Sequence, residues 1–323
     1  MTRVSLLCVI TIVFAGSNST ASAQSDDVIS QVTSLRLAGQ LAEAKLLAEE
    51  SLSTSGTAFD RVRLHLEIAK IHDRVGLHHN TRPVEAALTN INKAEAAAEP
   101  GHRTSEALIE LARANYYYRA EMAERQFAVA IPHAERAIEL FGQIGDRRNE
   151  AESVHILGLI EMQIGNLERA RELFELSLLL DQQSGERAYF RGEYERHVGF
   201  VIMMQGDNES AIPYFERSLQ RRQESDAVDA SLFAASTLAS SLVNAGRLDD
   251  AWPVIAYGMM VAQKIDSPVG MARIGLVQGR LHAEAGDKRA ARLAYEMTIK
   301  VAESVASTSM AEQASRELAA LAD

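Results

Sequence analysis

Cysteine is almost missing from this chain of 323 residues, because its single copy, Cys8, lies in an apolar stretch close to the N-terminus. We expect that stretch to be removed, for reasons given below, so the mature chain would contain no thiol. A protein without thiols has no disulfide framework and no cysteine nucleophile. Its stability must then come from packing.

Glycine and proline are also scarce, with 19 and 6 copies. Few helix-breaking residues mean few turns and long regular elements. Alanine, leucine, glutamate and arginine are abundant, and these residue types favour helices. Beyond residue 23, no long alternating run of valine, isoleucine and threonine marks a strand. The composition therefore predicts an all-α protein.

A surplus of basic residues is missing too. The net charge is -11 at pH 7, and acidic and basic residues alternate along the chain without blocks of one sign. This pattern is typical of solvated helical surfaces. Because contacts to phosphates supply much of the affinity of nucleic-acid binders, we expect no nucleic-acid partner.

Long apolar runs are absent after residue 23, since none reaches the roughly 18 residues of a membrane-spanning helix. The first 23 residues differ: Arg3 gives a positive start, Val4–Ala15 is apolar, and Ala21–Ala23 has small residues. This order is typical of a secretory signal peptide. We therefore expect a signal peptide at 1–23 and a mature domain at 24–323 that is exported, periplasmic or secreted, and not inserted in a membrane. An uncleaved anchor or a misassigned start is the alternative.

Catalytic and metal-binding motifs are absent as well. The sequence contains no G-x-x-x-x-G-K-S/T, no G-x-S-x-G, no H-E-x-x-H and no C-x-x-C. We therefore expect no enzyme activity, no cofactor and no metal. His72, His78 and His79 lie close together, and histidine nitrogens bind metals. We favour the simpler interpretation, an exposed loop, because no pair of carboxylates completes a ligand set.

An internal repeat is present, and its clearest unit spans residues 153–178. That unit has a small residue at Gly158, a turn that opens with Gly165, then Ala170 and the aromatic Phe174. The same order recurs with a period of about 40 residues, as Gly199, Gly206, Ala211 and Phe215, then Ala239, Gly246, Ala251 and Ile255, then Gly279, Gly286, Ala291 and Tyr295. One period before the first unit, Arg125 stands in place of the turn glycine.

A second marker has the same period. It consists of Ala130-Ile-Pro132, Ala211-Ile-Pro213 and Ala251-Trp-Pro253, the first two separated by two periods and the last two by one. We place these prolines near helix starts, where the missing N–H costs little. Weaker copies lie at 35–44 and 60–99, and 307–323 is expected to form one more amphipathic helix. Units of this length cannot bury their apolar faces alone, so they must stack.

This pattern resembles the tetratricopeptide repeat family, and the resemblance is good over residues 111–300. Because the family's standard unit has about 34 residues, the spacing of about 40 residues resembles its longer-unit branch, as in kinesin light chain. The resemblance implies a right-handed superhelical α-solenoid of about seven helix-turn-helix repeats. It also implies that the first helix of each unit lines a concave groove for a protein or peptide partner.

Carried onto this chain, the groove positions implied by the resemblance give a set of candidate partner-binding residues: Asn115, Arg119, His155, Leu159, Met162, Arg196, Phe200, Met203, Arg273 and Arg280. The arginines are suited to pairing with partner carboxylates, and methionine suits adaptable surfaces. One branch of the family holds a C-terminal carboxylate with a fixed Lys/Asn/Arg set, and the sequence does not reproduce that set. A plain solvated inner face is the alternative for these residues.

The tyrosines at 116, 117 and 118 allow two interpretations: an aromatic wall of the groove, or three side chains that helical periodicity sends in different directions. For the whole chain, the leading hypothesis is an exported scaffold or adaptor. The alternative is a sensory or regulatory domain that acts through a separate membrane signalling protein. An enzyme with the groove as its cleft is the least favoured.

Overall fold

The computed structural model describes residues 18–81, 84–122, 125–185 and 188–321, with side chains from residue 26 on. All regular structure in these ranges is helical. The helices are α1 (Asn18–Leu37), α2 (Leu41–Thr54), α3 (Ala58–His79), α4 (Glu85–Ala97), α5 (Arg103–Ala120), α6 (Ala130–Ile144), α7 (Arg147–Ile164), α8 (Leu167–Gln183), α9 (Ala188–Met204), α10 (Asn208–Glu224), α11 (Val228–Asn244), α12 (Leu248–Lys264), α13 (Pro268–Glu284), α14 (Lys288–Ser304) and α15 (Thr308–Ala320).

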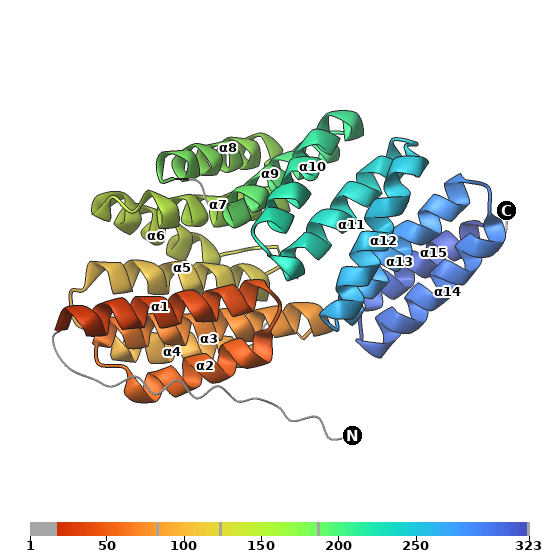
Figure 1. The fold of residues 1–323 in the computed structure, drawn as a ribbon. Helices are drawn as coiled ribbons and strands as arrows, with labels where there is room; N and C mark the ends of the chain where they lie inside the picture. Colours follow the sequence, from red (N-terminus) through yellow and green to blue (C-terminus); the bar gives the residue numbers. More distant parts are fainter. Residues whose placement is uncertain (1–17, 82–83, 123–124, 186–187, 322–323) are drawn as a thin grey trace, which may run out of the picture.

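The described helices form seven consecutive pairs followed by α15, so the predicted α-solenoid is confirmed. Each helix packs on the next one along the chain. The stack curves, and its N-terminal helices come back towards α11–α13 (Figure 1). Of the predicted signal peptide, residues 1–17 lie outside the described residues, and the backbone of 18–23 belongs to α1. No described helix is both long and apolar enough to cross a membrane.

A small residue facing a large one holds each central pair together. A Cβ added to Gly158 on α7 would lie 2.7 Å from Cε1 of Phe174 on α8, and one added to Gly199 would lie 2.7 Å from Cε1 of Phe215. Both phenylalanine side chains are fully buried. These contacts are the ones that the repeat pattern predicted, and they form the core of the stack.

Two turns in each central unit use the left-handed backbone region. Within the pairs α7–α8, α9–α10, α11–α12 and α13–α14 the turn residue is a glycine, as the sequence predicted. Arg125, which replaces that glycine between α5 and α6, keeps the conformation with a φ of 54°. Between successive pairs the left-handed residues also follow the period, as Gly145, Gly185, Asp226, Asp266 and Ala306.

The prolines lie deeper than expected in two of three cases. Pro132 is in the first turn of α6, but Pro213 and Pro253 are the sixth residues of α10 and α12. The reason is that α10 and α12 begin close to the turn glycines, at Asn208 and Leu248, whereas α6 begins only at Ala130. In the second turn a proline removes one intrahelical hydrogen bond.

Candidate functional site

The two ends of the stack meet at a closing contact. We define it by three residues from the end of α3, Arg74, His78 and Asn80, and the groups that they reach on the C-terminal half: Asp229, Ser267 and the carbonyls of Val305 and Ala306. His78 and Ser267 are separated by 189 residues in the sequence. The contact turns an open arc into a closed one, so α3 becomes a wall of the inner face.

The groups in the closing contact are polar and mostly buried. Arg74 Nε lies 3.4 Å from Oδ2 of Asp229, whose side chain is fully buried. His78 Nδ1 lies 3.0 Å from Oγ of Ser267, and its ring stacks on Phe233. Burial lowers the pKa of His78 to about 4, with the charge of Arg74 acting in the same direction and that of Asp229 against it. His78 is therefore neutral at pH 7.

This arrangement corrects one expectation. The structure places His72, His78 and His79 on α3, so they do not form an exposed loop. The helix runs on until Asn80, which adopts the left-handed conformation of a C-cap and ends it. His78 is buried and faces α13, whereas His79 is exposed.

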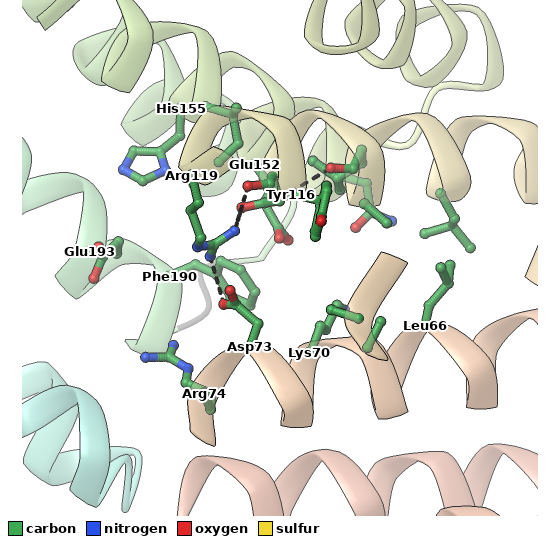
Figure 2. Close-up of a pocket in the computed structure, with 18 of the residues that line it drawn as sticks. Leu66, Lys70, Asp73, Arg74, Tyr116, Arg119, Glu152, His155, Phe190 and Glu193 are labelled. Atoms are coloured by element: carbon green, nitrogen blue, oxygen red, sulfur yellow. Dashed lines mark hydrogen bonds and ion pairs between the residues drawn. The ribbon is translucent and has the colours of Figure 1, made fainter. Parts of the chain in front are cut away.

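A cavity of about 200 Å³ lies between α3, α5, α7 and α9. One end is apolar and is lined by Leu66, Ala87, Ile91, Leu108 and Leu111. The other end is polar, and Figure 2 shows Arg119 and Asp73 between Leu66 and Glu193. A cavity with an apolar body and a few placed polar groups is the usual form of a ligand site.

Arg119 from α5 connects the cavity to α3. Its Nη2 lies 3.0 Å from Oδ2 of Asp73, and its Nη1 donates to the backbone carbonyl of Asn115 at 2.6 Å. Burial lowers the pKa of Arg119, and the neighbouring charge of Arg74 lowers it further, although Asp73 opposes the shift. The guanidinium is thus an enclosed cation with one described carboxylate partner.

A chain of hydrogen bonds fixes the wall formed by α7 and α9. Nε2 of His155 lies 2.8 Å from Nδ1 of His197, and Nη2 of Arg196 lies 2.9 Å from Nε2 of His197. Since an arginine can only donate, Nε2 of His197 accepts, and Nδ1 of His197 carries a proton that faces both Nε2 of His155 and, at 3.1 Å, the backbone carbonyl of Glu193. Burial lowers the pKa of His155 to about 3 and that of His197 well below its usual range. Both rings are neutral.

His155, Glu193 and His197 also place their ligand atoms within 4.8 Å of one another, which is the spacing of a possible metal site. Four contacts indicate a hydrogen-bond network in that place. The two rings are hydrogen-bonded to each other, and Arg196 donates a hydrogen bond to Nε2 of His197. Arg196 and Arg222 both form ion pairs with Glu193. Two cations beside the carboxylate would oppose a metal ion. The donor set does not fit a metal.

Arginines outnumber carboxylates beside this network. Arg196 lies over the ring of Phe200 at 5.2 Å, and Arg273 on α13 lies over the ring of Phe233 at 5.6 Å. Burial lowers the pKa of Arg196 to about 10 and also that of Arg222 to about 10. Burial lowers the pKa of Arg273 too, and the charge of Arg196 acts in the same direction.

The sequence-predicted groove residues fall into three groups. Asn115, Arg119, His155 and Leu159 line the cavity. Arg196 and Arg273 lie over the rings of Phe200 and Phe233, Phe200 and Met203 pack partly buried against the core, and Met162 is buried in the core with Leu159. Arg280 stands apart, because its Nε lies 3.0 Å from both carboxylate oxygens of Glu317 on α15. Their role in partner binding stays a prediction.

The tyrosines of α5 point in different directions, as the second interpretation predicted. Tyr116 lines the cavity, Tyr117 stacks on His133 of α6, and Tyr118 is buried against Phe127. They do not form a common aromatic wall.

Sequence reasoning missed the contribution of α3 to the site. Leu66, Lys70, Asp73 and Arg74 line the cavity, yet they belong to a copy of the repeat that is weak in sequence. Tyr189 was missed too. Its hydroxyl accepts a hydrogen bond from Arg74, and Cζ of Arg222 lies 5.4 Å from the centre of its ring. No local signal marks these residues, because they become neighbours only when the stack closes.

The repeat is recognisable by comparison with known proteins. The family model described as tetratricopeptide repeat matches residues 151–184, the unit that is clearest in the sequence. This match supports the resemblance to that family for one unit and does not distinguish the longer-unit branch. No curated protein matches the sequence.

Solved structures with a similar fold cover most of the chain. A Rap protein in complex with competence and sporulation factor has a TM-score of 0.57 and 14% identity, covering 93% of this chain and 98% of that one. The apo form of RapI has a TM-score of 0.56 and 14% identity, covering 80% and 97%. Aspartyl phosphate phosphatase F from Bacillus subtilis has a TM-score of 0.55 and 13% identity, covering 97% and 96%. At these identities the likeness shows the fold alone.

Proposed function

We propose that this protein is a binding scaffold that holds a short peptide, or an extended segment of a partner protein, on its inner face. The observation that carries the proposal is the cavity between α3, α5, α7 and α9, which has an apolar end and a charged end. A peptide offers apolar side chains for the first and polar groups for the second. One of the structures with a similar fold was solved with a factor bound to it, which agrees with such a use of the fold.

The repeat period of about 40 residues, longer than the family's standard unit, supports a place in the longer-unit branch of the family. The leader-like residues 1–23 support export to the periplasm or the medium. Both are part of the proposal. N-terminal sequencing of the protein from periplasmic and culture fractions tests export: a start at Gln24 is expected, and a start at Met1 in the cytosolic fraction would contradict it.

The binding proposal can be tested by filling the cavity. Ala112 on α5 lines it and has room for a longer side chain, so Ala112→Met should occupy the space. Ala42→Met on the exposed side of α2 is the matched control. Equilibrium binding of a fluorescein-labelled pool of random heptapeptides is the readout. We expect the wild type and the control to bind part of the pool and Ala112→Met to lose most of it. Equal binding by both variants would place the ligand elsewhere, and no binding by the wild type would refute the peptide proposal.

A further inference from the structure

We propose that a second copy of this chain docks on the face formed by α12, α13 and α14, so that the protein forms a two-fold dimer with the two α14 helices antiparallel. This face lies towards the C-terminal end of the stack (Figure 1) and shares no lining residue with the cavity described above. The proposal is carried by an apolar groove, by an exposed apolar ridge at the edge of that groove, and by the order of charges along α14.

The groove lies between α12 and α14, with α13 as its floor, and has a volume of about 510 Å³. Met271, Gly275 and Gln278 form the floor, and their spacings of four and three residues place them on one face of α13. Met259 from α12 and Met297 from α14 line the sides. None of the lining residues is an aspartate, glutamate, lysine or arginine. Because methionine side chains are flexible and apolar, the groove suits apolar side chains of a partner surface.

The corresponding place one repeat earlier is bridged by a hydrogen bond. With the period of about 40 residues, Tyr257 and Ser231 occupy the positions that Met297 and Met271 occupy in the groove. The hydroxyl of Tyr257 donates to Oγ of Ser231 at 2.9 Å, which holds the tyrosine side chain against α11. Met297 has no group that can form such a bond. The groove is therefore found where the repeat changes from a hydrogen-bonded pair to two methionines.

The edge of the groove on α14 is an exposed apolar ridge. Leu293 is 55% exposed and Met297 is 61% exposed, and their spacing of four residues places them on one face of the helix. A surface that carries a ridge beside a groove is complementary to itself, because a two-fold axis places the ridge of each copy in the groove of the other. Removal of both ridges from water would drive the association.

The charges along α14 favour an antiparallel arrangement of the two copies. In the described stretch 287–303, the first half exposes Lys288, Arg289 and Arg292 beside one acid, Asp287, and the second half exposes Glu296 and Glu303 beside one cation, Lys300. A two-fold axis near Ala294 brings Arg292 of one copy opposite Glu296 of the second copy. Neither side chain has an ion pair with a described residue, whereas Arg171 and Glu175, at the same spacing on α8, pair at 2.9 Å. Lys300 comes opposite Asp287 and Lys288 of the second copy, whose charges cancel.

The association is tested by sedimentation velocity of the full chain over a dilution series. We expect the wild type to pass from monomer to dimer as its concentration rises. Met297→Glu should raise the dissociation constant about a hundredfold or more, because it would bury a carboxylate against apolar side chains. Leu179→Glu is the matched control, since Leu179 on α8 is 50% exposed and lies far from the groove in the stack. Circular dichroism verifies that each variant is folded.

A charge exchange tests the antiparallel arrangement. Arg292→Glu and Glu296→Arg each place like charges opposite one another, so each should weaken its own dimer about tenfold or more. An equal mixture of the two variants should associate as the wild type does, because every carboxylate then faces a guanidinium of the other chain. A mixture that associates no better than either variant alone would overturn the arrangement. A wild type that stays monomeric at every concentration, or a dimer that Met297→Glu leaves intact, would overturn the docking face itself, and the first of these would leave the groove to an apolar segment of another protein.

Discussion

Two kinds of interface hold this molecule in shape, and they are built differently. Neighbouring helices along the stack meet through apolar contacts such as Gly158 against Phe174, and these recur with the period of the repeat. The closing contact joins α3 to the C-terminal half through single polar pairs, Arg74 with Asp229 and His78 with Ser267. Stacking is therefore distributed over many similar contacts, whereas closure depends on a few groups that occur once, including the ring of His78 on Phe233 and the exposed Asn80.

The largest effect should come from breaking closure. Arg74→Met leaves the buried carboxylate of Asp229 without its counterion, which typically costs about 3–5 kcal/mol. Because stacking does not need this pair, we expect the arc to open while the helices remain. Small-angle scattering should show a larger radius of gyration, with unchanged circular dichroism. Arg136→Met removes an exposed cation of α6 and is the control, because solvent-exposed ion pairs contribute little to stability. Unchanged scattering in Arg74→Met would show that the apolar contacts alone close the arc.

The next largest effect should come from the stack itself. Gly158→Val places side-chain atoms where Cε1 of Phe174 lies, and overpacking of this kind costs about 3 kcal/mol. Urea unfolding measures the loss. Gly142→Ala on α6 is the matched control, since its Cβ would meet nothing closer than 3.7 Å, and alanine favours the helix over glycine by about 1 kcal/mol. A stable Gly158→Val protein would mean that the ring of Phe174 can move aside.

Acid should weaken closure through His78. The pKa of His78 is about 4 in the folded protein against 6.5 for an ordinary histidine, so the unfolded chain binds the proton more readily. The contribution of the neutral His78 to the free energy of unfolding is complete above pH 6.5 and falls as the pH drops towards 4. At pH 5 about 2 kcal/mol of this stability is lost. Urea titrations between pH 7.5 and 5 should show a shallower decline in His78→Gln than in the wild type. The exposed His79→Gln is the control. The same decline in both variants would remove His78 from the explanation.

The smallest effect concerns a turn. Ala306 has a φ of 51°, a region that costs residues other than glycine about 1 kcal/mol. Ala306→Gly should relieve this strain and, after the extra entropy of the unfolded chain, stabilise the protein by about 0.5 kcal/mol. Urea unfolding is again the measurement. Ala285→Gly at the end of α13, where φ is negative, should destabilise instead. Destabilisation by Ala306→Gly would show that the turn is not strained.

Periodicity explains how much could be predicted. Gly158, Phe174 and their copies were identified from the sequence because equivalent residues recur at the same positions of successive repeats. The left-handed turns at Asp226, Asp266 and Ala306 were not, because these residues share a conformation and no side-chain type. The resemblance assigned Asn115, Arg119 and His155 to one groove, and the structure places them around one cavity, while their role in partner binding stays a prediction. Arg74 and Tyr189 could not be found, since their partners are set by the accumulated curvature of the whole stack.

The hydrogen bonds from the Asn80 side chain to the carbonyls of Val305 and Ala306 have a kinetic consequence. They bind the end of α3 to the turn before α15 without any covalent link, so the enclosure can open and close reversibly. A ligand large enough to need that opening would have an association rate that levels off at high concentration, at the rate of opening. Groups of the inner face would then set how long the ligand stays, and Asn80 how fast it enters.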